Sequence, residues 1–283
     1  MSEDTVVIRT SGLTKRYGSL AAVTDLSINI GRGEVFGLLG PNGAGKTTTI
    51  KMLTTLSKPD SGSCSIDGID VVRDPIAIKE RIGVVPQENN IDREMTAYEN
   101  LLIYAMLHRV AGRERKISNA LAMVELGDRR DSLASSFSGG MQRRLLIARA
   151  LLHEPAVLFL DEPSIGLDPQ IRRQMWDIIR RTRIDGRTVV ITTHYIEEAE
   201  ALCDRIGILS RGRLIALDTT AALKAGVGEY IVEFVNGEGR LIQQICRSRE
   251  EAHVIGRELD HSVTIRKTNL EDVFIRVTGE RIE

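Results

Sequence analysis

Residues 35–47 read Val35-Phe36-Gly37-Leu38-Leu39-Gly40-Pro41-Asn42-Gly43-Ala44-Gly45-Lys46-Thr47. The apolar start predicts a buried strand, which leads into a loop of the form Gly, four residues, Gly-Lys-Ser/Thr. Backbone N–H groups of such a loop converge on the phosphates of a nucleoside triphosphate, and the helix after it adds its positive dipole end. Lys46 is predicted to reach the β- and γ-phosphates, and the Thr47 hydroxyl to ligate Mg²⁺. A chance match is the alternative, and the flanking strand and helix count against it.

A second apolar run, residues 156–160, ends in two carboxylates. Asp161 at the end of this predicted strand can hold Mg²⁺ opposite Thr47. Glu162 can polarise an attacking water as a general base. Two acids at an exposed strand end are common in themselves, but their place after a buried strand and downstream of the phosphate loop favours this role.

Three single residues stand where a nucleotide site needs them. Gln87 follows the predicted strand 82–86, and its amide oxygen can ligate Mg²⁺ and sense the γ-phosphate. His194 follows the strand 188–193 and can donate a hydrogen bond to that phosphate. Tyr17 can stack on adenine. Taken alone, each of the three is more often a surface or structural residue.

Ser138-Gly139-Gly140 is a second anion-binding turn, hereafter the signature turn: a hydroxyl, two permissive residues and the start of a helix. Taken alone it reads equally well as an ordinary helix cap. Two such sites in one chain reach one γ-phosphate only if the fold brings them together. A two-fold dimer does so by holding each nucleotide between the phosphate loop of one subunit and the signature turn of the other.

Composition limits the function classes. The 283 residues, 42% of them hydrophobic, suit one large domain, or a large domain and a small one. A net charge of -1 gives no bulk attraction to nucleic acid or anionic lipid, and the Arg-rich stretch 172–187 reads as a solvated helix face. Three scattered cysteines indicate a reducing compartment. The start of the chain has no signal-peptide core, and no apolar run approaches the ~20 residues of a membrane span. Any membrane role is therefore expected to run through a separate partner.

The pattern along the chain predicts an α/β fold. Strands and short helices are expected over residues 1–95, with Ile50, Leu53 and Leu56 on one face of the helix after the phosphate loop. Helices are expected over 96–153, opened by a capping box at Thr96.

Strands and helices alternate over residues 156–218, which predicts a mostly parallel sheet with helices on both faces. Asp168-Pro169 is expected to start one of these helices. A turn-rich stretch over 224–229 then leads to a small α/β tail, which ends in a helix capped by Asn269.

With these elements in this order, the chain resembles the nucleotide-binding subunits of ABC transporters over roughly residues 5–218. The resemblance makes Tyr17 the adenine-stacking aromatic, Gly40 to Thr48 the Walker A loop, Gln87 the Q-loop, Ser138 to Gln142 the signature, Val157 to Glu162 the Walker B strand with its catalytic Glu, Asp168 part of the D-loop, and His194 the switch histidine.

One departure concerns the signature, where Phe137 and Met141 replace the Leu and Gln of the usual Leu-Ser-Gly-Gly-Gln. The Ser and both Gly residues are kept, so a working site is expected. This form, together with the tail 270–279, resembles a branch of bacterial or archaeal export ATPases like those of daunorubicin-resistance and nodulation-factor exporters.

The resemblance implies a P-loop ABC-type fold with a mixed sheet, helices on both faces, an antiparallel β-subdomain and a helical lobe at about 88–153. The ATP-binding domain would span 5–218 and an accessory domain 219–283. It further implies an ATPase that uses ATP and Mg²⁺, dimerises on ATP, and drives export through separate integral membrane permease subunits at the cytoplasmic face of the membrane. Tyr98, Leu101 and Leu102 are candidates to line the permease groove, or are simply core.

Two other classes compete. A non-transport ABC-type ATPase acting on nucleic acid or ribosomes usually has two cassettes or a long coiled-coil insertion, and this chain has neither, nor a basic stripe. A P-loop kinase or GTPase is disfavoured by the signature turn, Glu162 and His194. The sequence does not reveal the cargo, the permease or the role of the tail, and the direction of transport rests on the resemblance alone.

Overall fold

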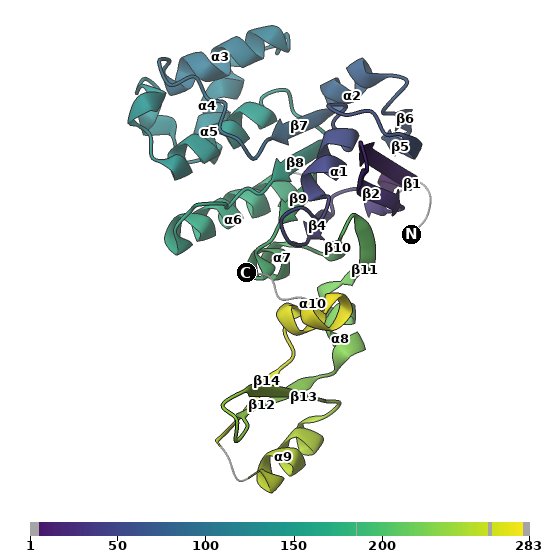
Figure 1. The fold of residues 1–283 in the computed structure, drawn as a ribbon. Helices are drawn as coiled ribbons and strands as arrows, with labels where there is room; N and C mark the ends of the chain where they lie inside the picture. The colour runs from purple at the N-terminus through teal and green to yellow at the C-terminus, as the bar shows by residue number, and fades with distance from the viewer. Residues whose placement is uncertain (1–5, 185, 260–261, 280–283) are drawn as a thin grey trace.

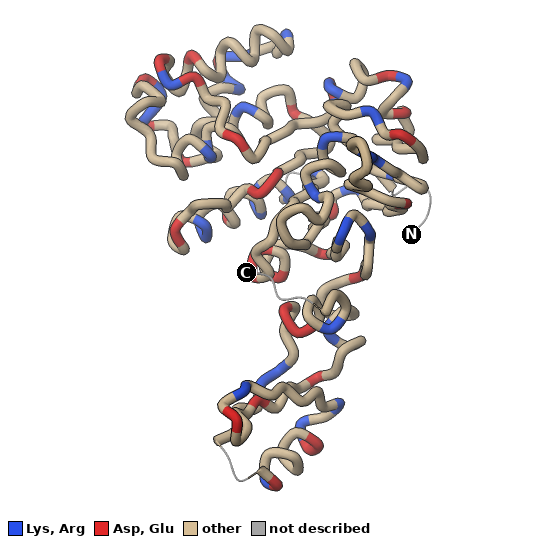
Figure 2. Tube along the Cα trace, in the orientation of Figure 1, with Lys and Arg blue, Asp and Glu red and all other residues tan. Residues whose placement is uncertain are grey.

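The computed structural model describes residues 6–184, 186–259 and 262–279, which form three sheets with helices packed between and around them (Figure 1). No helix within these ranges is both long enough and apolar enough to cross a bilayer. Lys and Arg are interspersed with Asp and Glu along the helices and the tail (Figure 2). The α/β class predicted from the sequence is confirmed.

The central sheet carries the ends of the strands that hold the predicted site. Its strands, in spatial order, are β11 (Arg213–Thr219), β10 (Arg205–Ser210), β4 (Val35–Leu39), β9 (Thr188–Thr193), β8 (Val157–Asp161) and β7 (Ile82–Val85). All neighbours pair in parallel except β10 and β11, so the predicted mixed sheet is confirmed. Strands β4, β8 and β9 are buried at every residue, as expected for a sheet covered on both faces. The carboxyl ends of these strands share one edge, where ligands bind in such folds.

An antiparallel sheet covers one face of the central sheet, with α1 (Lys46–Leu53) and α2 (Pro75–Arg81) beside it (Figure 1). Its strands are β1 (Val6–Tyr17), β2 (Leu20–Leu26), β3 (Asn29–Gly31), β5 (Ser61–Ile66) and β6 (Ile69–Asp70). Ile8, Ile50 and Phe159 belong to one buried cluster that joins this sheet, α1 and the central sheet. The prediction for Leu56 was wrong: α1 ends at Leu53 and Leu56 is 67% exposed.

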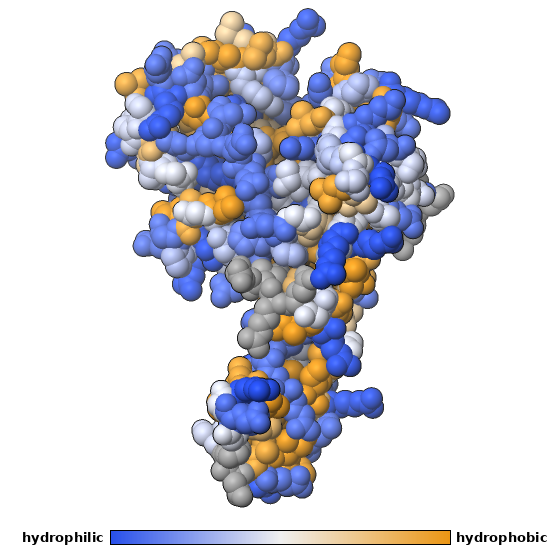
Figure 3. Space-filling model, viewed as in Figure 1, coloured by the Kyte–Doolittle hydropathy of each residue, from blue (hydrophilic) through white to orange (hydrophobic). Residues whose placement is uncertain are grey.

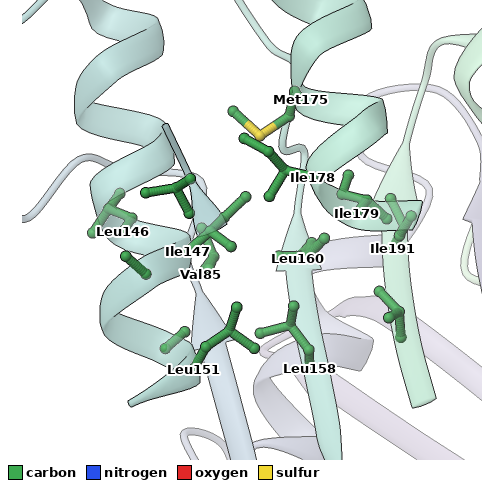
Figure 4. Packing of buried hydrophobic residues seen from close by; sticks show 14 of the residues in the cluster. Val85, Leu146, Ile147, Leu151, Leu158, Leu160, Met175, Ile178, Ile179 and Ile191 are labelled. Carbon is green, nitrogen blue, oxygen red and sulfur yellow. The ribbon is translucent and has the colours of Figure 1, made fainter. Parts of the chain in front are cut away.

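Two helices, α5 (Gly139–Leu151) and α6 (Pro169–Ile184), cover the other face of the central sheet (Figure 4). Leu146 and Ile147 of α5 and Ile178 of α6 lie against Leu158 and Leu160 of β8 in this view. Fully burying one such side chain stabilises the fold by about 1.5–3 kcal/mol. This packing fixes α5, whose first turn carries Ser138, on the sheet that carries the phosphate loop.

The predicted helical run over 96–153 is confirmed. Its helices are α3 (Ala97–Leu107), α4 (Arg113–Met123) and α5, with short 3₁₀ turns η2 (Gly127–Arg129) and η3 (Ala134–Ser136). Thr96 forms the predicted capping box with Glu99. Ser138 caps α5 by accepting a hydrogen bond from the Met141 N–H at 3.3 Å.

The tail consists of α8 (Thr220–Val227), β12 (Tyr230–Val235), β13 (Leu241–Cys246), α9 (Arg249–Glu258), β14 (Val263–Lys267) and α10 (Leu270–Thr278). The three strands form an antiparallel sheet, and α9 packs Ala252 against Val232 and Cys246. The predicted Asn269 cap is confirmed as a full capping box. The final helix, α10, returns to the main body: Phe274 is fully buried in its core beside α7 (Ile196–Leu202) and α8.

Candidate nucleotide site

The phosphate loop joins β4 to α1 at the carboxyl edge of the central sheet. Gly45, with φ 103°, caps α1 without a side-chain hydrogen bond, so the N–H groups of the first turn face outward for an anion. A Cβ on Gly45 would lie 2.5 Å from the Ala22 carbonyl oxygen, and one on Gly40 would lie 2.3 Å from the Leu209 carbonyl oxygen. Both glycines are therefore required by close backbone approach, and Gly45 by its positive φ as well.

A cavity of about 640 Å³ opens above this loop, a size suited to a nucleotide. The predicted residues that line it are Tyr17, Asn42, Gly43, Gly45, Lys46, Thr47, Thr48, Gln87 and Glu162. Sequence reasoning missed four further lining residues: Leu20, Ala21, Ala22 and Arg211. The three apolar residues follow β1 and extend the wall beside Tyr17, whose ring is half exposed and has Lys15 Nζ 5.5 Å from its centroid.

Lys46 is folded back into its own loop. Its Nζ donates to the carbonyl oxygens of Gly40, at 2.6 Å, and Pro41, at 3.0 Å. It also lies 3.0 Å from Glu162 Oε1, with both side chains about 5% exposed or less. A triphosphate in the cavity would compete with all three oxygens for the ammonium group.

Glu162 contacts two other predicted catalytic residues, Lys46 and His194. Its Oε2 is 2.7 Å from His194 Nδ1. Its backbone has φ 50°, a conformation that costs a non-glycine residue about 1–3 kcal/mol. The Glu162 N–H donates to Thr192 O at 3.1 Å and to Thr192 Oγ1 at 3.0 Å, and these bonds hold the strained turn that directs the carboxylate into the cavity.

The His194 ring packs against the ring of Tyr195. The Tyr195 ring centroid lies 4.1 Å from the His194 ring centroid, and the Arg172 guanidinium lies 4.1 Å from the Tyr195 centroid. Arg172 therefore departs from the predicted solvated face of α6, whereas Arg180, Arg181 and other members of that stretch are exposed as expected.

Thr47 and Asp161 meet across the loop. Thr47 Oγ1 donates to Asp161 Oδ1 at 3.2 Å, and Thr192 Oγ1 donates to the same oxygen. Hydroxyl and carboxylate oxygens, with the Gln87 amide at the cavity wall, are a hard donor set that fits Mg²⁺. No three His, Cys, Asp or Glu side chains cluster as a metal site in the part of the chain that is described. The nucleotide phosphates would therefore have to complete the coordination.

The signature turn lies apart from this cavity. Ser138 and Gly139 are exposed and outside the cavity lining, whereas Gly140 is buried where α5 meets Ile171 of α6. Asp168 is also exposed, and its Oδ1 accepts a hydrogen bond from the Ile171 N–H at 3.0 Å, which confirms its expected place at the start of α6. One chain thus brings the phosphate loop, Gln87, Glu162 and His194 together and leaves the signature turn facing outward.

Two buried groups that support the site were not predicted. Arg143 of α5 is 7% exposed and donates to the backbone carbonyls of Gln87 and Glu162. Glu198 of α7 is fully buried and accepts hydrogen bonds from Ser164 and Trp176; burial raises the pKa of its carboxyl. The burial of Arg143 and Glu198 could have been suspected only because each is a polar residue within an apolar helical stripe. For Arg143 this signal is weak, because the neighbouring Arg144 makes the pair look like part of a charged, exposed helix face.

A buried parallel sheet, a glycine loop at its carboxyl edge, and a paired Lys and Glu in a nucleotide-sized cavity define a P-loop nucleoside triphosphatase. The ABC transporter family model matches residues 23–165. The chain belongs to this family and is an ATP-binding subunit with ATPase activity.

Two similar proteins and one similar solved structure indicate the branch of the family. The chain is 37% identical over 304 residues to the Nod factor export ATP-binding protein I of Mesorhizobium japonicum, covering 100% of this chain and 89% of the relative. It is 42% identical over 253 residues to the daunorubicin/doxorubicin resistance ATP-binding protein of Streptomyces peucetius, covering 89% and 74%. A solved dimeric ATP-binding cassette in a post-hydrolysis state with ADP and Pi matches with a TM-score of 0.68 at 29% identity, covering 75% of this chain and 98% of that chain. The suspected likeness to the export branch is confirmed.

Proposed function

We propose that this chain is the ATPase subunit of an exporter, that two copies close around two ATP molecules, and that this cycle drives separate membrane subunits. The observation that carries the proposal is the split site: Lys46 and Glu162 line one cavity and His194 is hydrogen-bonded to Glu162, while Ser138 faces outward. The export role is supported by the names of the similar proteins, and the dimer by the similar solved cassette.

The residues of the cavity have separable tasks. Tyr17 stacks on adenine, and the backbone of residues 40–48 binds the phosphates. Lys46 leaves Glu162 and moves to the β- and γ-phosphates when ATP enters. Glu162 then accepts the proton of the attacking water, and His194 donates a hydrogen bond to the γ-phosphate.

Mg²⁺, held by Thr47, Asp161 and Gln87, would neutralise charge that develops on the phosphates. The partner subunit completes the site with its own signature turn, whose hydroxyl and helix N-terminus approach the γ-phosphate from the opposite side. Asp168 is exposed, as Ser138 is, and directly precedes α6. It is therefore assigned to the contact between the two subunits.

The chain is proposed to consist of an ATP-binding domain at residues 5–218 and an accessory domain at residues 219–283. The ATP-binding domain includes a helical lobe at about residues 88–153. Because α10 packs into the main core, the accessory domain is anchored at both α8 and α10.

The permease is proposed to dock on the helical lobe, which would hold the chain at the cytoplasmic face of the membrane. Of the two alternatives for Tyr98, Leu101 and Leu102, the packing favours core, since Leu101 is fully buried and Tyr98 and Leu102 are partly buried against the same cluster. The exposed apolar face of α3 consists instead of Ile103, Met106 and Leu107. Figure 3 shows apolar surface over the top of the helical lobe, where α3 lies. A groove of about 230 Å³ lined by Ile103 and Leu107 lies beside it.

The experiment that tests the proposal is ATP hydrolysis by the purified chain over a range of protein concentrations. Activity per chain is expected to rise with concentration and then level off, because one complete site needs two chains. Activity per chain that is independent of concentration, from a species that stays monomeric with ATP, would contradict the shared site.

A further inference from the structure

Arg143 lies five residues after Ser138, one turn inside α5, with its guanidinium directed into the protein. Burial lowers the pKa of this group to about 10, which still leaves it charged at neutral pH. A buried charge is retained only where it is well paired or hydrogen-bonded. The hydrogen bonds of Arg143 all go to backbone carbonyls from two separate loops of the site, and the carboxylates of Asp161, Glu162 and Glu198 add favourable charge interactions.

One side of the guanidinium holds the end of β8. Nη2 donates to the carbonyl oxygens of Asp161 at 2.6 Å and Glu162 at 3.0 Å, and Nε donates to that of Pro163 at 3.1 Å. These three carbonyls span the strained turn that directs Glu162 into the cavity. A cation among three successive carbonyls opposes any rotation of this turn.

The other side holds the segment after β7. Nη1 donates to the carbonyl oxygen of Pro86 and, at 3.3 Å, to that of Gln87. The planar fork of an arginine can span two loops in this way, whereas a lysine offers donors from a single point.

We propose that Arg143 is a positioning residue that fixes the Gln87 and Glu162 loops to the helix that starts at the signature turn. The inference rests on the proposed roles of Gln87, Glu162 and Ser138. Because α5 carries Ser138 toward the partner's ATP, Arg143 makes the chain's own catalytic loops and the face it offers to the partner move as one unit. ATP binding to the phosphate loop needs no such link, so Arg143 acts on turnover and closure rather than on nucleotide affinity.

The test compares Arg143→Gln with Arg144→Gln. Arg144 is the matched control, because it is the next residue of α5 but donates to the Val124 carbonyl and pairs with Glu125 inside the helical lobe. Fluorescent ATP analogue binding, kcat per binding-competent chain, and thermal unfolding are measured for each variant. Arg143→Gln is expected to keep its nucleotide Kd within about threefold and to lose at least about tenfold in kcat, whereas Arg144→Gln keeps both within about threefold.

Closure gives a second readout that does not depend on turnover. In a Glu162→Gln background, Arg143→Gln is expected to weaken the ATP-dependent dimer peak on sizing chromatography, and Arg144→Gln to leave it intact. If Arg143→Gln does not fold, Arg143→Lys decides: it keeps the charge but cannot span both loops, so kcat is expected to fall at least about fivefold at unchanged Kd.

The inference is overturned if the folded Arg143 variant keeps kcat within about threefold of wild type. It is equally overturned if its Kd and kcat decline together with stability as those of a merely destabilised protein do. Failure of the proposed function would give a different result: the wild-type chain would not hydrolyse ATP, or the Glu162→Gln variant would hydrolyse it at the normal rate.

Discussion

Replacing Glu162 by glutamine is expected to have opposite effects on ATP binding and on hydrolysis. Lys46 Nζ lies 3.0 Å from Glu162 Oε1 in the buried site, so ATP must take the ammonium group away from this carboxylate. The contact is an ion pair in which Oε1 accepts no aligned hydrogen bond from the described residues, so its contribution is taken as about 1.4 kcal/mol, just below the range of about 1.5–3 kcal/mol for hydrogen bonds to charged groups. Removing this competition should tighten ATP binding about tenfold, since about 1.4 kcal/mol corresponds to a factor of ten.

Hydrolysis should fall for a separate reason. Glutamine has nearly the shape of glutamate but cannot accept the proton of the attacking water. General-base catalysis contributes about 10²–10⁴-fold, so kcat should drop at least about 100-fold. The hydrogen bond between Glu162 Oε2 and His194 can be kept by an amide, so the fold of the site should not change.

The assay pairs equilibrium binding of a fluorescent ATP analogue with phosphate release, on wild type, Glu162→Gln and the control Glu197→Gln. Glu197 is exposed at the start of α7, and its substitution changes the net charge equally. The control should match wild type in both measurements. A kcat loss below about tenfold in Glu162→Gln refutes the general base, and an unchanged or weaker Kd refutes the competition for Lys46.

Three further predictions concern other parts of the chain. Ser138→Arg in the Glu162→Gln background should abolish the ATP-dependent dimer on sizing chromatography but leave monomer ATP binding unchanged, because bulk and charge enter only the shared face. Phe274→Ala should lower the free energy of unfolding in urea by about 3–5 kcal/mol, because this fully buried ring of α10 belongs to the main core. Burial lowers the pKa of His153 from its ordinary value of 6.5. Below about pH 6.5 the unfolded chain therefore binds more protons at this residue than the folded chain does. The free energy of unfolding should fall as the pH drops from about 6.5. His153→Gln, which can still donate to the Ile82 carbonyl, should flatten this acid loss in Tm measured between pH 5 and 8.

Each of the three has a result that contradicts it. An undiminished dimer peak in the Ser138→Arg variant would rule out the shared phosphate site. A cost below about 1 kcal/mol for Phe274→Ala would mean that α10 is not part of the core. An acid limb that is equally steep in the His153→Gln variant would assign the loss of stability to other groups.

The sequence predicted the parts of the site whose chemistry is local. The phosphate loop is recognisable because its glycines, Lys46 and Thr47 must follow one another at fixed spacing. The strand before it and the acids at the end of β8 are recognisable from uninterrupted apolar runs. The caps at Thr96, Ser138 and Asn269 depend on residues three positions away, and the structure has all three.

The remaining features depend on contacts between distant segments. Arg143 looks like any helical arginine until α5 packs beside the ends of β7 and β8. Leu101 and Ile103 are both apolar, and only the packing of α3 decides which is core and which is exposed. Leu56 fitted a helical stripe, but Thr55 has φ 66° and turns the chain away after α1. The return of α10 to the main core was likewise invisible, since its stripe shows that it is buried but not against what.

Each ATP site is proposed to be assembled from two chains, so two impaired variants should complement one another. Lys46→Ala removes the lysine contact to the phosphates, and Ser138→Ala removes the hydroxyl of the signature turn without adding bulk that would keep the chains apart. Each variant alone should therefore be strongly impaired. In a mixed dimer, the Ser138→Ala chain still supplies Lys46 and the Lys46→Ala chain still supplies Ser138, which leaves one complete site.

The decisive measurement is therefore the ATPase activity of an equimolar mixture of Lys46→Ala and Ser138→Ala. A shared site predicts recovery to roughly a quarter of the wild-type activity, because random pairing places half of the chains in mixed dimers with one complete site each. A mixture no more active than the average of the two variants measured separately would contradict it.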